Sequence, residues 1–308
     1  MKILVTGASG FVGSHIVEAL AAAGHEVRGA SRTLPSGSRR KPGVDYRDHV
    51  DVADKSTLTP ELFSGIEAVV HLIGIIQEGR NGQTFQRIHV EGTKNVVERA
   101  VSAGTVTQFV YMSAIGTAVD APAEYSRTKF AAETIVKESG LPYTIFRPSL
   151  VIGKDGEFVE QMGDLIKHGG LPVPLPFPFI PVPGSGLNKF QPIYIDDLCE
   201  CVVKAFADPE TKGETYEVGG ASQLTFNELL SKMAVALKVK KPMLHAPIPI
   251  LRIVATVMES ILPKPPVTRD QLKNLGRDNI TSSNAVHDVF GIEPLSFDDM
   301  IPRIYGQS

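Results

Sequence analysis

Short apolar runs alternate with longer amphipathic stretches along the first half of the chain. Residues 2–6 form an apolar run, and residues 11–23 carry apolar side chains at helical spacing up to Gly24. The same alternation continues to about Arg147. We expect further strands at 26–30, near Val44, and at 68–73, 108–113 and 143–147, and further helices at 55–63, 84–103 and 125–139.

This alternation predicts an α/β protein. Strands separated by helices of this length are joined by right-handed crossovers and form a parallel sheet with helices on both faces. The expected fold is a Rossmann-type doubly wound parallel sheet with a smaller C-terminal substrate lobe. We assign residues 1–150 to a Rossmann domain that binds NAD(P), and residues 151–308 mostly to the lobe, with some segments returning to the Rossmann core.

The pattern changes after Arg147. Prolines recur between Pro172 and Pro183 and predict a loop, because proline fixes φ and lacks a backbone donor. Helices are expected at 196–208 and 225–237, and a strand at 215–218. The segment Ile248–Leu262 is almost continuously apolar but too short to cross a bilayer. Two interpretations stay open for it: a helix packed under the lobe, or a contact with a membrane surface or a partner in a complex.

Composition excludes several function classes. The 308 residues are 43% apolar and carry a net charge of −3, without the basic patch that gathers nucleic acid. The histidines show no ligand spacing with cysteine or carboxylate, so no metal site is expected. The first strand begins at Lys2, which predicts no signal peptide. We expect a cytoplasmic protein, with peripheral membrane association as the alternative.

A glycine-rich turn follows the first strand and opens the first helix. Gly7 permits the tight turn, Gly10 lets backbone N–H groups approach a pyrophosphate, and Gly13 lets helix and strand pack closely. The helix N-terminus adds its dipole. The turn residues expected to bind the nucleotide are Gly7, Ser9, Gly10, Phe11, Val12 and Gly13.

The loop after the second strand selects between the two dinucleotides. NAD binders usually place a carboxylate there to accept from the ribose 2′-hydroxyl, whereas NADP binders place an arginine. This chain has Arg32 at that point and no carboxylate. We expect NADP(H) to be preferred, with NAD(H) also possible. Asp51 and Val52, after the third strand, are expected to hold the adenine amino group.

With these residues in place, the chain resembles the short-chain dehydrogenase/reductase superfamily, in its extended and atypical branch of epimerases and dehydratases. The resemblance covers nearly the whole chain. Within the branch, Arg127, the proline-rich segment and Pro265-Pro266-Val267-Thr268 are most similar to proteins resembling the nucleotide-binding accessory subunit of respiratory complex I. The further matching motifs are His71-Leu72-Ile73-Gly74, Gly92-Thr93-Lys94-Asn95, Tyr125-Ser126-Arg127-Thr128-Lys129, Arg147-Pro148-Ser149, Gln191-Pro192-Ile193-Tyr194-Ile195-Asp196-Asp197 and Tyr216-Glu217-Val218-Gly219-Gly220.

The resemblance implies a catalytic pair, Tyr125 and Lys129. They are four residues apart at the start of a predicted helix and therefore share a face. An adjacent ammonium is expected to bring the pKa of the tyrosine from near 10 closer to neutral, so that the phenol can exchange a proton with a substrate hydroxyl. The resemblance further implies that Lys129 holds the nicotinamide ribose. It also places Leu72, Ile73, Gly74 and Pro148 against the cofactor.

The third catalytic position of the resembled family is a serine or threonine, and here the chain departs from the pattern. One alignment places Ala114 at that position, which would remove a donor from a developing oxyanion. The other places Ser113 there, only twelve residues before Tyr125. Ser113 is the candidate, and Thr117 is a more distant one.

Two functions follow from these residues. The first is an NAD(P)-dependent oxidoreductase or epimerase/dehydratase-like enzyme, with Tyr125 as acid/base beside Lys129. The second is an NADPH-binding structural or sensor subunit of a larger, complex I-like assembly with little or no catalysis. Neither the small-molecule substrate nor the oligomeric state is predicted.

Overall fold

The computed structural model describes residues 1–79, 82–169, 178–262, 265, 267–274 and 276–306. The chain folds into two compact units, each built from three stretches of sequence. The first unit comprises Met1–Pro148, Ile195–Val218 and Ser283–Ile292. The second comprises Ser149–Tyr194, Gly219–Ser282 and Glu293–Ser308.

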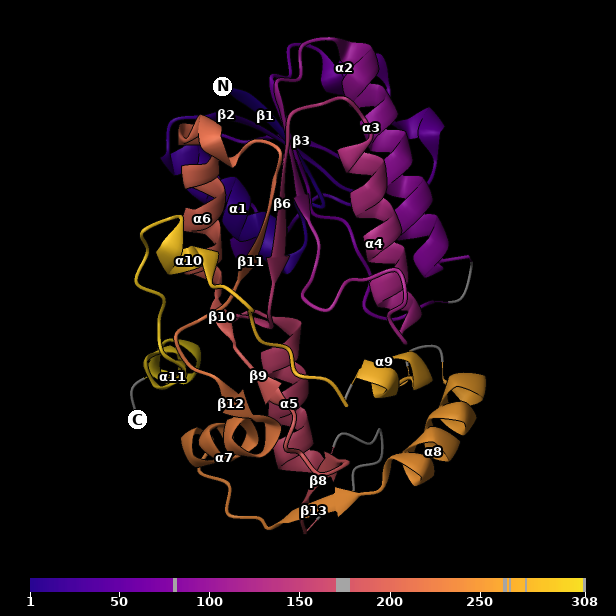
Figure 1. Cartoon of the computed structure of the whole chain (residues 1–308), viewed down its shortest axis with the longest axis vertical. Coiled ribbons are helices and arrows are strands. Elements are labelled where there is room, and N and C mark those ends of the chain that lie inside the picture. Colours follow the sequence, from indigo (N-terminus) through magenta and orange to yellow (C-terminus); the bar gives the residue numbers. More distant parts are fainter. Residues whose placement is uncertain (80–81, 170–177, 263–264, 266, 275, 307–308) are drawn as a thin grey trace. The chain divides into compact units, whose positions relative to one another are not determined.

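A seven-stranded sheet forms the centre of the first unit (Figure 1). Its strands are β1 (Lys2–Thr6), β2 (Glu26–Ala30), β3 (Asp45–Arg47), β4 (Ala68–His71), β5 (Gln108–Met112), β6 (Tyr143–Pro148) and β11 (Glu214–Val218). They lie in the order β11-β6-β5-β4-β1-β2-β3, and every neighbouring pair is parallel. The chain builds outward from β1 to β3 and then returns to build the other half. The predicted doubly wound parallel sheet is confirmed.

Helices cover both faces of this sheet (Figure 1). On one face α1 (Phe11–Ala22) packs against α6 (Ile195–Ala207), and α10 (Ala285–Asp288) contacts α6 and β11. On the other face α3 (Gly92–Ala103) contacts both α2 (Pro60–Phe63) and α4 (Glu124–Lys137). Because the sheet is covered twice, its central strands are mostly apolar and buried. The fully buried side chains include Leu4, Val69, Phe109 and Ile145.

Two of the predicted helices of this unit differ in the structure. The stretch 55–63 is a 3-10 turn, Lys55–Thr57, followed by the short helix α2. Thr59 precedes Pro60, and proline occupies the first helical turn, where its missing N–H costs nothing. The stretch 84–103 is not uniformly α-helical, because Gln86–Glu91 form a π-helical turn before α3. Such turns widen a helix locally and are frequent at functional sites.

The second unit is made of short strands and surface helices. Its helices are α5 (Glu157–His168), α7 (Phe226–Ala236), α8 (Ile248–Ile261), α9 (Arg269–Asn274) and α11 (Phe297–Tyr305). Its strands pair two by two: β7 (Val151–Ile152) with β10 (Ile193–Tyr194), β9 (Lys189–Phe190) with β12 (Leu224–Thr225), and β8 (Ile180–Pro183) with β13 (Met243–Ala246). The helices expected at 196–208 and 225–237 correspond to α6 and α7, and the strand expected at 215–218 corresponds to β11.

The loop predicted between Pro172 and Pro183 ends in a strand instead. Residues 170–177 lie outside the described part of the chain, but β8 runs parallel to β13. Ile180 and Gly184 donate their backbone N–H groups to the carbonyls of Pro242 and Ala246. The prolines of β8 alternate with residues whose backbone N–H groups point toward β13. The backbone nitrogens of the prolines therefore point away from β13, where no hydrogen bond to that strand is lost. Proline is tolerated at such an edge.

Candidate functional site

The glycine turn joins β1 to α1 and lies against two neighbouring strand ends. Gly7 has φ +82°, a conformation that favours glycine. Its N–H donates to the carbonyl of Ala30, at the end of β2, over 2.9 Å. A Cβ on Gly7 would lie 3.1 Å from Cγ1 of Ile73, just after β4. The turn therefore occupies the carboxyl edge of the sheet, where Rossmann folds bind nucleotides.

The turn has the geometry of an anion cradle. A Cβ on Gly13 would lie 2.1 Å from the carbonyl oxygen of Gly7, so only glycine allows this close packing. Gly10 is the N-cap of α1, and no side chain caps the helix. The N–H groups of the first helical turn thus lack a side-chain acceptor, and the helix dipole favours a negative charge there. These features fit the pyrophosphate of a dinucleotide.

The residue expected to recognise the ribose is exposed at the end of β2. Arg32 follows β2, and its backbone carbonyl accepts from the N–H of His49 over 3.2 Å. The carbonyl of Ser31 accepts from the N–H of Val50 over 3.1 Å. These two bonds bring the 49–50 segment alongside the start of the Arg32 loop. The backbone of Arg32 therefore lies at the same edge of the unit as the glycine turn, whose Gly7 N–H donates to the carbonyl of Ala30.

The predicted adenine segment directly follows this pair of bonds. The carboxylate of Asp51 accepts from the N–H of Ala53 over 3.0 Å, which fixes a local turn. The carbonyl of Val52 accepts from the side-chain amide of Asn95 on α3 over 2.9 Å. Val52 also packs against Gly92, where a Cβ would lie 2.8 Å from its methyl group. The helix α3 thus holds this segment in place.

Gly74 links the nucleotide cradle to the predicted catalytic helix. A Cβ on Gly74 would lie 2.9 Å from Nζ of Lys129 and 3.5 Å from Nε2 of His89. Ile73, its neighbour, contacts Gly7. A continuous set of contacts therefore runs from the glycine turn through residues 73 and 74 to α4. The sequence placed these residues in one site, and the structure brings them together.

Lys129 is buried on the sheet-facing side of α4. Its ammonium donates to the carbonyl of Met112 over 2.9 Å and lies 5.0 Å above the ring of Tyr111. Burial lowers the pKa of Lys129 to about 8, and the negative charge of Glu133 opposes that shift. At neutral pH the lysine is charged, but little free energy is needed to discharge it.

Tyr125 differs from the expectation in its acidity. Burial of the hydroxyl raises the pKa of Tyr125 to about 12, so the predicted shift towards neutrality is wrong for this arrangement of side chains. Desolvation disfavours the phenolate, and the ammonium of Lys129 is engaged by the carbonyl of Met112. The Tyr125 ring packs edge-on against Phe85 and His89. The side chain is therefore a protonated phenol held by aromatic contacts.

His89 is a site residue that the sequence analysis missed. It lies on the π-helical turn, is fully buried, and has its Nδ1 2.9 Å from the hydroxyl of Thr128, next to Lys129. Burial and the nearby Lys129 charge lower the pKa of His89 to about 3. A signal for it existed: His89 falls on the buried face of the helix 84–103, where a polar side chain requires a partner.

A second buried histidine stabilises the strand ends beneath the cradle. Nδ1 of His71 lies 2.6 Å from the hydroxyl of Thr6, and Nε2 lies 3.1 Å from that of Thr93. Burial lowers the pKa of His71 to about 3. This chain of hydrogen bonds connects β1, β4 and α3. It fixes the two strands from which the glycine turn and the Gly74 segment emerge.

Ser113 and Pro148 lie at the ends of adjacent strands. The N–H of Ser113 donates to the carbonyl of Phe146, and the N–H of Ile115 donates to that of Pro148. The hydroxyl of Ser113 is buried and lies 3.4 Å from that of Thr117. Thr117 in turn donates to the carbonyl of Ala114 over 2.5 Å. Thr117 uses its one hydroxyl proton in that bond, so of the two hydroxyls Ser113 stays the candidate donor.

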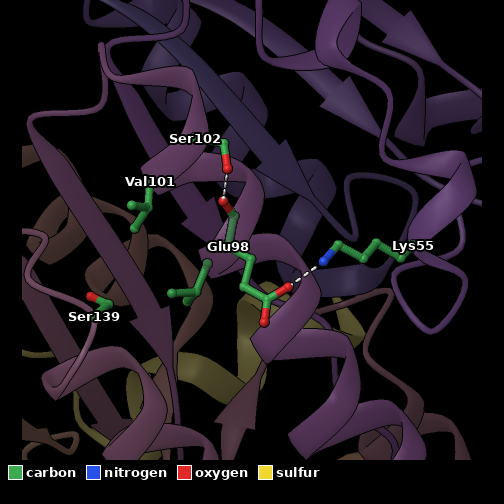
Figure 2. A pocket seen from close by; sticks show the side chains of 6 residues that line it. Lys55, Glu98, Val101, Ser102 and Ser139 are labelled. Atoms are coloured by element: carbon green, nitrogen blue, oxygen red, sulfur yellow. Dashed lines mark hydrogen bonds and ion pairs between the residues drawn. The ribbon is translucent and has the colours of Figure 1, made fainter.

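A pocket on the outer side of the helix layer is distinct from this edge. Figure 2 shows Lys55, Glu98, Val101, Ser102 and Ser139 around it. Lys55 pairs with Glu98, and the hydroxyl of Ser102 donates to the carbonyl of Glu98. These are ordinary surface contacts, and none of the predicted site residues lines the pocket. In the described part of the chain, no group of histidine, cysteine and carboxylate side chains has the arrangement of a metal site.

Comparison with known proteins places this geometry in a family context. The family described as "NAD dependent epimerase/dehydratase family" matches residues 3–219. The structure is similar to that of a UDP-glucose 4-epimerase from Thermotoga maritima, with a TM-score of 0.73 and 19% identity. That similarity covers 99% of this chain and 97% of the other. At this level of identity the similarity shows a shared fold and nothing more.

Curated relatives point to a particular group. The chain is 27% identical over 296 residues to the protein named NADH dehydrogenase [ubiquinone] 1 alpha subcomplex subunit 9, mitochondrial, from Arabidopsis thaliana. The match covers 92% of this chain and 71% of that protein. The protein of the same name from Dictyostelium discoideum is 25% identical over 231 residues, which are 73% of this chain and 61% of that protein. The chain thus spans less than the full length of both relatives.

Proposed function

The chain belongs to the NAD dependent epimerase/dehydratase family, and on this premise we propose that it is an enzyme that interconverts a hydroxyl and a carbonyl group on a small molecule. The observation that carries the proposal is the set of contacts from Gly7 through Ile73 and Gly74 to Lys129. These contacts support the proposal that an anion cradle and an acid/base pair share one edge of the sheet. A protein that only held a nucleotide would need the cradle and Lys129, but not the phenol of Tyr125.

Nicotinamide, when bound, would supply hydride transfer to or from a substrate carbon. Tyr125 is protonated at neutral pH, since its pKa is raised to about 12, so it begins as the acid in the reducing direction. Its O–H bond breaks as a new O–H bond forms on the substrate oxygen. To stabilise the phenolate that remains, the ammonium of Lys129 would have to turn from the carbonyl of Met112 toward Tyr125, and it carries its charge below about pH 8.

We propose NADP(H) as the preferred dinucleotide, because Arg32 follows β2 where NAD binders carry a carboxylate. A charge-assisted hydrogen bond contributes roughly 1.5–3 kcal/mol, which corresponds to about one to two orders of magnitude in affinity. Arg32 is exposed, so its replacement should leave the fold intact. The cradle itself would bind either dinucleotide.

The first experiment measures both parts of this proposal. The purified protein is denatured, released nucleotide is identified by mass spectrometry, and the stripped protein is titrated calorimetrically with NADPH and NADH. We expect NADPH to bind at least about tenfold more tightly, and Arg32→Ala to remove the difference without abolishing NADH binding. Equal affinities in the wild type would reject the role of Arg32. Absence of binding by either nucleotide would reject the cradle.

A second candidate function is an NADPH-binding subunit of a larger assembly. Two observations favour it: the mitochondrial relatives are named as subunits of NADH dehydrogenase, and the raised pKa of Tyr125 makes its hydroxyl a weaker proton donor. The variant Tyr125→Phe separates the two functions, with Tyr143→Phe, outside the site on β6, as control. Loss of turnover with unchanged nucleotide affinity in Tyr125→Phe alone supports the enzyme. Identical behaviour of both variants and the wild type supports the subunit.

A further inference from the structure

The helix α8 exposes an apolar face that the rest of the described chain leaves uncovered. Only Ala255 of its fourteen residues is buried. Five apolar side chains are between 37% and 68% exposed and recur at the spacing of one helical face: Ile250, Ile253, Val254, Val257 and Ile261. The segment is a helix as expected, and a helix packed on all sides would bury such a face.

The neighbours of α8 leave this face free. Among the described elements, α8 contacts α9 most extensively. These contacts involve the side of α8 opposite the apolar face. Glu259, the only acidic residue of α8, is held there by Arg269, whose Nε and N–H each approach a carboxylate oxygen to 2.6 Å. The acidic charge therefore lies with the packed side. Single exposed apolar residues are common, but a continuous stripe marks an interaction surface.

Charge along the surrounding chain selects the kind of partner. Residues 238–282 contain eight lysines and arginines against two aspartates and one glutamate, although the whole chain has a net charge of −3. Arg252 is exposed on α8 itself, and Lys238 and Lys240 are exposed shortly before it. A second copy of this chain would bring like charges together across a symmetric contact, which is unfavourable. An anionic surface is complementary to both the charge and the stripe.

We propose that α8 docks the protein on the surface of a bilayer that contains anionic lipids. The helix would lie in the plane of the interface with Ile253 and Val257 directed into the acyl region, and the basic residues of the surrounding chain would attract the anionic headgroups. It does not cross the bilayer: fourteen residues span about 21 Å, against roughly 30 Å of hydrocarbon. No helix in the described ranges is long and apolar enough to do so. The proposal is independent of any catalytic activity.

Vesicle sedimentation of the full chain tests this docking. We compare vesicles of phosphatidylcholine alone with vesicles that also contain phosphatidylglycerol. The wild type should bind the anionic vesicles at least about tenfold more strongly, and added salt should weaken that binding. The double variant Ile253→Asp/Val257→Asp should lose it. The matched control is Val235→Asp, which should have no effect: Val235 is an apolar residue on α7 of the same unit and, at 77%, is even more exposed than Ile253.

A spectroscopic measurement distinguishes docking from other losses. The chain has no tryptophan, so Val257→Trp introduces a single reporter on the stripe, and Val235→Trp introduces one elsewhere. Anionic vesicles should shift the emission of the first to shorter wavelength and leave the second unchanged. Equal responses of the two reporters, absence of binding to anionic vesicles, or self-association through the stripe in place of vesicle binding would each overturn the proposal.

Discussion

The backbone N–H of Ile75 donates a hydrogen bond to Nε2 of His89 over 3.0 Å. Since an N–H can only donate, Nε2 must accept, and the single proton of the neutral ring lies on Nδ1, which donates to the hydroxyl of Thr128 over 2.9 Å. The carbonyl of Ile75 also lies 3.1 Å from Nε2, but the tautomer that would bond it leaves the N–H unpaired. His89 therefore ties the segment after β4 to α4, the two elements that carry the candidate site.

Replacing His89 should loosen this connection. The variant His89→Leu leaves the partly buried N–H of Ile75 without its histidine acceptor; loss of an acceptor by a fully buried N–H typically costs about 1–3 kcal/mol, so the effect here should lie at the lower end. We expect a lower midpoint of urea unfolding, together with weaker nucleotide binding because Gly74 is no longer held against Lys129. The control is His168→Leu at the exposed end of α5. If both variants unfold at the wild-type midpoint, His89 does not have this structural role.

Stability should fall steeply in mild acid. The pKa values of His71 and His89 are both lowered to about 3 in the folded protein, while an unfolded histidine titrates near 6.5. Between about pH 3 and pH 6.5, therefore, these two histidines bind a proton in the unfolded chain but not in the folded protein. Each histidine therefore removes up to about 1.4 kcal/mol of folding free energy per pH unit below 6.5, and neither contributes above it.

Urea unfolding at pH 7.5 and at 5.5 measures this dependence. The variant His71→Asn should reduce the decrease in unfolding free energy between these pH values by about half, because two similar histidines contribute to it. His168→Asn should leave it unchanged, since His168 is exposed. A wild-type free energy of unfolding that is equal at the two pH values would contradict the assigned protonation states.

The parts of the site that follow strand and helix periodicity could be predicted from the sequence. The glycine turn, the ends of β2 and β4, and the start of α4 all lie where the alternation of strands and helices places them. The π-helical turn at Gln86–Glu91 could not be predicted in this way, since its apolar spacing resembles that of an α-helix. The acidity of Tyr125 also depends on desolvation by neighbours that are distant in sequence.

Sequence pattern was likewise insufficient in the second unit. Prolines excluded a central strand but not the edge strand β8, because the exclusion depends on which side of the strand has a neighbour. The length and apolarity of α8 predicted a helix, but which of its faces stays exposed is set by packing partners that no local pattern specifies.

The close approach of Gly13 to Gly7 predicts strict dependence on glycine. In Gly13→Ala the new methyl group would lie 2.1 Å from a backbone oxygen, so α1 and the turn must separate. Overpacking of this kind typically costs about 1–3 kcal/mol, and nucleotide binding should fall with it. Gly163 on α5 has no atoms near its hypothetical Cβ, so Gly163→Ala should stabilise the protein by roughly 0.5–1 kcal/mol. Scanning calorimetry gives the melting temperature of each variant relative to the wild type. Equal shifts of that temperature in Gly13→Ala and Gly163→Ala would reject the packing argument.

The ion pair between Glu133 and Arg147 anchors α4 to β6. Nε and a terminal nitrogen of Arg147 approach the carboxylate at 2.8 and 2.5 Å, and the side chain of Glu133 is 1% exposed. Removal of one partner leaves a buried charge, so Arg147→Met should cost about 3–5 kcal/mol in urea unfolding. The double variant Glu133→Gln/Arg147→Met should recover much of that loss. A double variant that is less stable than Arg147→Met would contradict this explanation.

The charge of Glu133 also raises the pKa of Lys129 against the effect of burial. If Lys129 contributes its ammonium to nucleotide binding, affinity should decline above about pH 8, where the folded protein loses that proton. In Glu133→Gln the opposing charge is gone, so burial acts alone and the decline should begin at lower pH. Lys129→Met should bind weakly at every pH and show no such decline. NADPH titrations across this pH range measure all three proteins, and an unchanged midpoint in Glu133→Gln would show that another group controls the pH dependence.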